Sequence, residues 1–354
     1  MSEPVRHTLL SASVWFVPLA FLLSWTAMGD GARFARVGTL PAQCHGQCTL
    51  QMTDANSGWL FGDRFLWTTN DGGITWRELP FPVLRPGDFA RGEFVNKLQG
   101  WLLSQTQRLY ETRDGGLQWT PQSLPESDGI IQAAWMSGDS SRAWLGGGEY
   151  RPSAGPDGPN YAIRRYESGG WGRLNPVVFR RTGIGATWNK QLLPRCSWSI
   201  FHLQFWDSQK GVAVGDNGCV YLTETGGDQW TLGTLHSKSE LAGREDDDGV
   251  PTIFLPSRDA KGWLSTRNGF YETNDGGKNW YEISASGTPH FDVFGFSDAA
   301  NGLAIARQSE IYESIDGGRT WKRLMLDMAP RYLYFLEKRR GWLLSDSGLY
   351  RVIQ

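Results

Sequence analysis

A nine-residue phrase recurs along the chain, and its repetition limits the possible folds more than any other feature. The clear copies "TTNDGGITW", "ETRDGGLQW", "ETNDGGKNW" and "ESIDGGRTW" end at Trp76, Trp119, Trp280 and Trp321. Two divergent copies end at Trp188 and Trp230, with Gly183 and Thr225 in place of the aspartate. An aromatic residue stands nine positions before each Trp, namely Trp67, Tyr110, Phe179, Tyr221, Tyr271 and Tyr312. This constant register indicates a tandem repeat of one structural unit.

A second repeated element, a small residue followed by a short apolar run, precedes each phrase. It begins at Gly58, Gly100, Ala143, Gly211, Gly262, Gly302 and Gly341. The steps between these positions are 42, 43, 68, 51, 40 and 39 residues. Four-stranded propeller blades have a period of about 40–50 residues. We therefore predict an all-β fold, a seven-bladed β-propeller, in which each blade has four strands, A to D.

The Asp-Gly-Gly sequence within the phrase has the chemistry of a tight turn. Glycine adopts positive φ angles without a Cβ clash, as a hairpin between strands C and D requires. An aspartate at the start of the turn accepts hydrogen bonds from the backbone of the turn itself. The Trp that follows can cover the turn and fill the wedge beside the next blade. All of these roles are structural.

The last copy of the repeat is incomplete, which predicts how the ring closes. "GWLLSDSGLYRVIQ" supplies strands B and C, with Tyr350 in the recurring aromatic position, and the sequence ends before a strand D. The segment "RFARVGTLP" at residues 33–41 resembles the other D strands, with Phe34 in place of the Trp. Pairing of this strand with the last blade would remove both free sheet edges. The propeller is thus predicted over residues 33–354.

Residues 1–29 have the layout of a targeting segment. Arg6 and His7 precede an uncharged run over residues 8–29. A positive start, an apolar middle and a small-residue exit are typical of a secretory signal peptide, and "AMG" at residues 27–29 offers a cleavage site. The same run is long enough to remain as a membrane anchor. We predict export to the periplasm or a lumen-like compartment, with either cleavage or N-terminal anchoring.

Four cysteines follow this segment. An even number in an exported chain favours disulfides. Cys44 and Cys48 are close enough in sequence to pair across a small loop, and Cys196 and Cys219 would then pair or stay free. "CHGQC" also offers Cys44, His45 and Cys48 as metal ligands, but no second pair with zinc spacing follows. We predict no metal and no cofactor.

The phrase matches a known repeat, the Asp-box or BNR repeat, which has the pattern S/T-x-D-x-G-x-T-W. "SIDGGRTW" and "TNDGGITW" match it residue for residue. The repeat occurs in sialidases, sortilin-type receptors, xyloglucanases and photosystem II assembly factors. In size and layout the chain is similar to the photosystem II stability and assembly factors of cyanobacteria and chloroplasts and to their relatives in non-photosynthetic bacteria. The resemblance implies a chaperone-like scaffold for membrane protein subunits, without catalysis.

The sequence offers few catalytic residues. A sialidase would need an arginine triad, a Tyr–Glu pair and an Asp acid, and its opening "R-I-P" signature is absent. Tyr–Glu pairs recur at one repeat position, at Tyr110-Glu111, Tyr271-Glu272 and Tyr312-Glu313. A catalytic pair is needed once, so repeated pairs are predicted to be structural. The same holds for the turn aspartates Asp71, Asp114, Asp275 and Asp316. Two carboxylates from different blades can converge in the folded ring without any sequence pattern. The sequence therefore does not exclude a glycosidase.

Two long insertions are predicted to lie on one face of the ring, since the B–C and D–A loops share a face. They cover residues of about 146–176 and 236–251. Long loops on a rigid scaffold are frequent recognition sites, and arginine and aromatic side chains anchor protein interfaces. The predicted partner-binding residues are Tyr150, Arg151, Tyr161, Arg164, Arg165, Trp171, Arg85, Arg91 and Arg195. Arg85, Arg91, Arg195 and Arg331 are expected in D–A loops, on the same face as the insertions. A surface hairpin that only packs on the ring is the alternative.

Two functions follow from these features. The first is an exported, non-catalytic propeller that binds a protein partner, a membrane or envelope protein, during assembly of a complex. The second is a sialidase-like carbohydrate-active enzyme or glycan-binding propeller that uses the mouth of the central channel. The net charge of −2 predicts no nucleic-acid partner.

Overall fold

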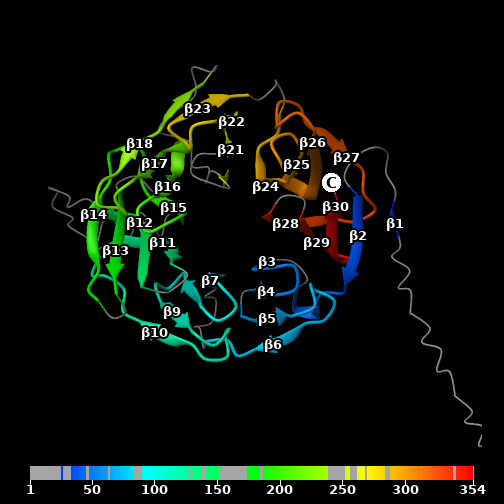
Figure 1. Ribbon diagram of the computed structural model, residues 1–354, viewed down its shortest axis with the longest axis horizontal. Helices are drawn as coiled ribbons and strands as arrows, with labels where there is room; N and C mark the ends of the chain where they lie inside the picture. Colours follow the sequence, from blue (N-terminus) through cyan, green and yellow to red (C-terminus); the bar gives the residue numbers. More distant parts are fainter. Residues whose placement is uncertain are drawn as a thin grey trace, which may run out of the picture.

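In the computed structural model, seven β-sheets surround a central axis like the blades of a propeller (Figure 1). The residues that the structure describes are 25–26, 33–44, 48–62, 64–82, 90–127, 129–137, 141–150, 174–183, 186–237, 252–255, 261–267, 269–283, 288–337 and 340–353. Within these ranges the chain is almost entirely strand and turn, with three short 3-10 helices, η1 (Ala42–Cys44), η2 (Asp216–Gly218) and η3 (Arg307–Ser309). The predicted all-β, seven-bladed architecture is confirmed.

Blades 1 to 6 follow one another along the chain, each with its first strand at the axis. Blade 1 contains β3 (Thr49–Met52), β4 (Gly58–Phe61), β5 (Leu66–Thr69) and β6 (Arg77–Leu79). Blade 2 contains β7 (Ala90–Phe94), β8 (Gly100–Ser104), β9 (Leu109–Thr112) and β10 (Thr120–Gln122). Blade 3 contains β11 (Gly129–Met136), β12 (Arg142–Tyr150), β13 (Leu174–Thr182) and β14 (Asn189–Leu192).

The second half of the ring repeats this order. Blade 4 contains β15 (Ile200–Phe205), β16 (Gly211–Gly215), β17 (Val220–Thr223) and β18 (Thr231–Leu232). Blade 5 contains β20 (Thr252–Phe254), β21 (Gly262–Thr266), β22 (Gly269–Thr273) and β23 (Asn279–Glu282). Blade 6 contains β24 (Phe291–Phe296), β25 (Gly302–Ala306), β26 (Glu310–Ser314) and β27 (Lys322–Leu324).

Blade 7 closes the ring as predicted. It combines β28 (Pro330–Glu337), β29 (Arg340–Ser345) and β30 (Gly348–Ile353) with the N-terminal strand β2 (Arg33–Gly38). Strand β2 pairs antiparallel with β30, so that Phe34 lies opposite Val352 and Arg36 opposite Tyr350. A further short strand, β1 (Trp25–Thr26), pairs with the outer edge of β2. Strand β2 and the last strand, β30, therefore lie side by side in one sheet (Figure 1).

The antiparallel order within each blade defines two faces. Connections from A to B and from C to D lie on one side, which we call the turn face. Connections from B to C and from D to A lie on the other, which we call the insertion face. The described ends of the first insertion, Tyr150 and Leu174, are paired across β12 and β13. Strand structure thus continues into the predicted insertion at both ends, because residues 146–150 and 174–176 are ladder residues, and the tip at 151–173 lies outside the described residues.

The Asp-Gly-Gly turns have the predicted chemistry. In blade 1, Gly72 and Gly73 adopt φ angles of 76° and 98°. The Asp71 carboxylate accepts hydrogen bonds from the Thr75 backbone N–H (2.9 Å) and from the Thr69 hydroxyl (2.8 Å). In blade 4 the Thr225 hydroxyl replaces the carboxylate as the acceptor for the Gln229 N–H (2.8 Å). Both versions tie the turn to its own backbone.

A tryptophan in strand B joins neighbouring blades, a role that the sequence did not reveal. In three blades this indole stacks on the phenylalanine that ends strand A of the next blade. The pairs are Trp59 with Phe94, Trp144 with Phe205 and Trp263 with Phe296, with ring centroids 3.9, 4.0 and 3.7 Å apart. Trp263 also donates a hydrogen bond from Nε1 to the Gly317 carbonyl in the next blade's turn (2.8 Å). The large aromatic content therefore serves the interfaces between blades.

One strand leaves its own blade, which the repeat pattern did not predict. After β18 the chain crosses to blade 5, where β19 (Thr234–His236) pairs parallel with β23. The crossing needs Gly233, because a Cβ at this position would lie 2.5 Å from the Gly277 carbonyl oxygen. Blade 5 therefore gains a fifth strand.

The predicted targeting segment at residues 1–29 lies outside the described residues except for Trp25 and Thr26. Among the described residues, no helix is long and apolar enough to cross a membrane.

Candidate functional site

A cavity of about 720 Å³ lies at the axis of the ring. Its lining comes from inner strands of five blades, β3, β7, β11, β15 and β28, and includes Arg91, Glu93, His202, Arg331, Tyr332 and Tyr334. Strands β7 and β28 begin at the insertion face, so Arg91 and Arg331, near the starts of these strands, mark that end of the cavity. Both arginines are exposed, and neither forms an ion pair with a described residue. The cavity therefore has a basic rim.

This placement corrects the prediction for Arg91 and Arg331, which were expected in loops between blades. Both belong to inner strands, because strand pairing begins earlier than the apolar pattern indicated: Ala90 already pairs with Ser104 and Pro330 with Ser345. Arg195 lies in the connection between β14 and β15 as expected and is exposed. For Tyr150 the backbone alone is described. The remaining predicted partner-binding residues lie outside the described part of the chain: Arg85, Arg151, Tyr161, Arg164, Arg165 and Trp171.

Glu93 occupies a position that carries out one task in three other blades. Gln51, Gln204 and Tyr334 lie in the same register as Glu93. Each of these strand A residues pairs with the strand B residue that follows the first glycine of that strand. Each bonds the backbone of the next blade: Gln51 donates to the Phe94 carbonyl (2.8 Å), Gln204 to the Leu255 carbonyl (3.0 Å) and Tyr334 to the Met52 carbonyl (3.0 Å). The Glu93 carboxylate forms no hydrogen bond or ion pair with a described residue.

The titration of the cavity residues follows from their burial. Burial raises the pKa of the half-buried Glu93 carboxyl to about 7. Burial, followed by the charge of Glu93, raises the pKa of Tyr332 to about 12 and also raises that of Tyr334. Burial lowers the pKa of His202, against the opposing effect of a hydrogen bond with the Gln204 side chain, and the Nε2 atom of His202 has no partner among the described residues. The sequence patterns did not predict the cavity residues Glu93, Tyr332 and Tyr334. For Glu93 and Tyr334 the available signal was their shared repeat position, opposite the residue that follows the strand B glycine.

A pair of carboxylates for glycoside hydrolysis is not formed by the described lining residues, of which Glu93 is the one acid. The repeated Tyr–Glu positions have structural partners instead. Glu111 is buried in an ion pair with Arg181 of the next blade (2.5 Å). Glu272 is likewise held by Arg319 of the next blade (2.8 Å) and by Lys261 (2.9 Å).

Two disulfides lie on the insertion face. The structure joins Cys44 to Cys48 in the connection that leads from β2 into blade 1. It also joins Cys196, in the segment before β15, to Cys219, in the connection before β17. Cys48 lies in the wall of the axial cavity. The bonds therefore restrain connections at the face where the cavity opens.

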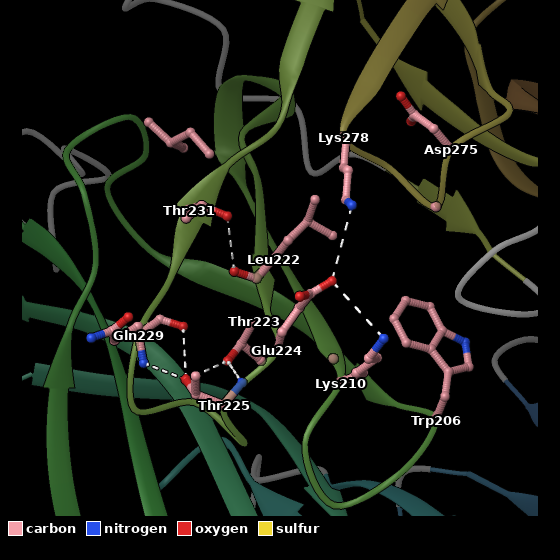
Figure 2. A pocket seen from close by; sticks show the side chains of 13 residues that line it. Trp206, Lys210, Leu222, Thr223, Glu224, Thr225, Gln229, Thr231, Asp275 and Lys278 are labelled. Carbon is pink, nitrogen blue, oxygen red and sulfur yellow. Dashed lines mark hydrogen bonds and ion pairs between the residues drawn. The ribbon is translucent and has the colours of Figure 1, made fainter.

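A second, smaller pocket of about 420 Å³ lies on the turn face between blades 4 and 5. Figure 2 shows Lys210 and Lys278 pointing toward the Glu224 carboxylate, each with 4.0 Å between the charged atoms. Glu224 and Lys278 are about two-thirds exposed. Asp275 takes part in its own turn, where it accepts from the Asn279 N–H (2.9 Å). Because its charges face water or are already bonded, this pocket is the weaker candidate.

Comparisons with known proteins identify similar propellers. No protein-family model matches the chain. The photosystem II assembly lipoprotein Ycf48 of Synechococcus sp. (strain CC9902) is 25% identical over 198 residues, which are 50% of this chain and 59% of that protein. The match thus spans less than two-thirds of the relative.

Solved structures match over nearly the whole ring. A structure of YCF48 bound to D1 peptide has a TM-score of 0.59 and 18% identity, and the match covers 93% of this chain and 99% of that one. A catalytically inactive virginiamycin B lyase from Staphylococcus aureus with quinupristin has a TM-score of 0.62 and 11% identity, over 91% and 99% of the two chains. At these identities the structural matches establish the propeller fold, and the expected resemblance to photosystem II assembly factors is confirmed by the similar proteins.

Proposed function

We propose that this chain is an exported, non-catalytic scaffold that binds a membrane or envelope protein at its insertion face and assists assembly of that partner's complex. The observation that carries the proposal is the axial cavity with its exposed arginines. Arg91 and Arg331 lie at its mouth, on the same face as Tyr150 and Leu174, the described ends of the blade 3 insertion. Rigid rings that present loops and a cavity at one face suit recognition of an extended segment.

The similar proteins support the same function. The curated relative is named as an assembly protein, and a structurally similar YCF48 is described as bound to a peptide. By analogy, we propose that this propeller binds a polypeptide segment of its partner. We also propose that residues 1–29 direct export and that the partner is therefore met in the periplasm or a lumen-like compartment.

The test is capture of a partner from the solubilised envelope of the host. Residues 151–173 are replaced by a two-residue Asn-Gly turn, since Tyr150 and Leu174 are register partners that such a turn can connect. We expect the variant to fold and to lose the envelope protein that the native chain retains. Rim charges steer association, so Arg91→Glu with Arg331→Glu should also weaken capture, with a steep dependence on salt.

The matched control is Lys278→Glu, an exposed charge reversal on the turn face. It should leave capture unchanged. Recovery of the same envelope protein by the hairpin variant and by both arginine reversals would refute the proposed binding face. Hydrolysis of glycosides by the purified chain, lost in Glu93→Gln, would refute the non-catalytic assignment.

A further inference from the structure

Within the described part of the chain, Glu93 forms no hydrogen bond or ion pair, although the residues in its register in three other blades do. Gln51, Gln204 and Tyr334 occupy the same register and bond the neighbouring blade. For Glu93, the equivalent backbone position on the next blade is that of Met136. Met136 in blade 3 corresponds to Phe94 in blade 2, because each pairs with the repeated small residue of strand B in its own blade. An ionised carboxylate cannot donate to a carbonyl, so Glu93 is unsuited to this structural task. A half-buried carboxylate that lacks a partner is stabilised by a cation.

The surroundings of Glu93 suit an organic cation. The cavity wall beside it contains the aromatic rings of Trp101, Tyr332 and Tyr334. Aromatic faces attract ammonium and guanidinium groups, most strongly where water is excluded. The Tyr334 hydroxyl already donates to Met52, which leaves its oxygen as an acceptor. Carboxylate, ring faces and neutral oxygen atoms together form a site for the end of a lysine or arginine side chain.

The rim of the cavity restricts which cation fits. Arg91 lies two residues from Glu93 on the same side of β7, which separates their Cα atoms by roughly 7 Å. Arg331 approaches from β28, and both arginines are exposed without an ion pair to a described residue. A lone cation would be repelled by these two charges on entry. A segment whose basic residue is flanked by acidic residues would match both the rim and the interior.

We propose that the axial cavity binds a lysine or arginine side chain of the partner, with Glu93 accepting the cation and Arg91 and Arg331 facing acidic residues beside it. The proposal rests on the proposed function and names the chemistry of the segment that is bound. The cavity volume of about 720 Å³ is large enough for a basic side chain and its neighbours.

The test is calorimetric titration of the full chain at pH 8 with three blocked peptides and one free amine. The peptides are Glu-Lys-Glu, Glu-norleucine-Glu and Gln-Lys-Gln, and the amine is butylamine. We expect Glu-Lys-Glu to bind about 10- to 100-fold more tightly than the norleucine peptide, the range for a hydrogen-bonded charge. Glu93→Gln should abolish this difference. Glu78→Gln, the same change on an exposed outer strand, should preserve it.

The arms of the experiment separate the alternatives. Equal binding of the lysine and norleucine peptides would overturn the proposal, as would an unchanged preference in Glu93→Gln. Glu93-dependent binding of butylamine as tight as that of Glu-Lys-Glu would show a free-amine site and would also overturn it. In Arg91→Gln with Arg331→Gln, the advantage of Glu-Lys-Glu over Gln-Lys-Gln should disappear.

A measurement on the native chain covers the case in which Glu93→Gln folds poorly. The charged and titratable groups around Glu93 are Arg91 on its own strand, His202 on β15, and Arg331, Tyr332 and Tyr334 on β28. Protonation of Glu93 removes the acceptor for the cation, so affinity for Glu-Lys-Glu should fall between pH 8 and pH 6 while that for the norleucine peptide does not. Identical pH profiles would contradict the proposal. Capture of an envelope partner in the earlier experiment is independent of this result.

Discussion

Glu93 shows how a single residue can turn a structural position into a functional one. Its equivalents Gln51 and Gln204 hold neighbouring blades together through neutral amide groups. The carboxyl at position 93 is raised in pKa to about 7 by burial, from an ordinary value of 4.5. The folded state therefore disfavours its charged form.

The first prediction concerns this cost. Because the folded pKa is raised, the contribution of Glu93 to stability is complete below about pH 4.5 and is lost as the pH rises through about 7. Glutamine stays neutral and can bond the next blade as Gln51 does. We expect Glu93→Gln to be more stable than the native chain at pH 8, by on the order of 1–3 kcal/mol. The part of this difference that comes from the charge of Glu93 should vanish near pH 4.5.

Equilibrium urea unfolding at pH 8 and pH 4.5 measures this effect, with Glu78→Gln as the matched control on an exposed strand. A stability difference of the same size at both pH values would show that charge is not its cause.

At the scale of the element, the Asp-Gly-Gly turn is a self-contained unit. Asp316 accepts hydrogen bonds from the Thr320 N–H (3.0 Å), the Thr320 hydroxyl (2.6 Å) and the Ser314 hydroxyl (2.9 Å). Burial opposes ionisation of this carboxyl, but the bonds from Thr320 and Ser314 outweigh it and lower the pKa below 3.8. Blade 4 performs the same turn with Thr225. The motif therefore needs an acceptor at this position and tolerates a weaker one.

The second prediction tests whether the turn needs an acceptor at this position and tolerates a weaker one. Asp316→Ala removes the acceptor and should lower the free energy of unfolding at pH 7 by about 1–2 kcal/mol, whereas Asp316→Thr should lose less. Because the folded pKa of Asp316 is depressed, its stabilisation is present above the unfolded value of 3.8 and is lost as the pH falls through the folded value. The gap between native and variant chains should therefore narrow below pH 3.8.

Thermal or urea unfolding at pH 7 and pH 3 gives these differences. Asp327→Ala, an exposed aspartate outside the turn, should change stability by less than about 0.5 kcal/mol. An equal loss of stability in Asp327→Ala and Asp316→Ala would contradict a stabilising role of the turn aspartate.

At the scale of the whole molecule, the ring depends on its closure. Phe34 is 3% exposed and packs in a cluster with Leu303 and Ile305 of blade 6 and with Leu343 and Val352 of blade 7. The N-terminal strand thereby secures two blades at once. Since the axial cavity is lined by five blades, its shape depends on this closure as well.

The third prediction concerns that closure. Phe34→Ala removes a buried ring from the junction of blades 6 and 7 and should cost about 3–5 kcal/mol of stability. Equilibrium unfolding measures the loss, and Leu192→Ala, at a side chain that is 71% exposed, is the control. If the two substitutions cost the same, the strand would not close the ring energetically.

The sequence by itself determined the blade count, the order of strands and the partner of the N-terminal strand. The blade count and the strand order depend on local interactions, because turn chemistry and a repeat period act within about 40 residues. The pairing of the N-terminal strand with the last blade is long-range, and the incomplete last copy of the repeat indicated it. Two of the glutamates in the repeated Tyr–Glu positions, Glu111 and Glu272, form ion pairs with Arg181 and Arg319 of the adjacent blade.

The candidate site and the exceptions to the repeat become apparent only in the three-dimensional structure. Glu93 and Tyr332 line the same axial cavity although they are far apart in sequence, and no period relates their identities. The parallel pairing of β19 with blade 5 depends on the close approach of Gly233 to Gly277, which no sequence pattern encodes. The strand B indoles likewise gain their partners only when the next blade packs against them. Long-range packing chooses these contacts, because it decides which side chains share the same buried space.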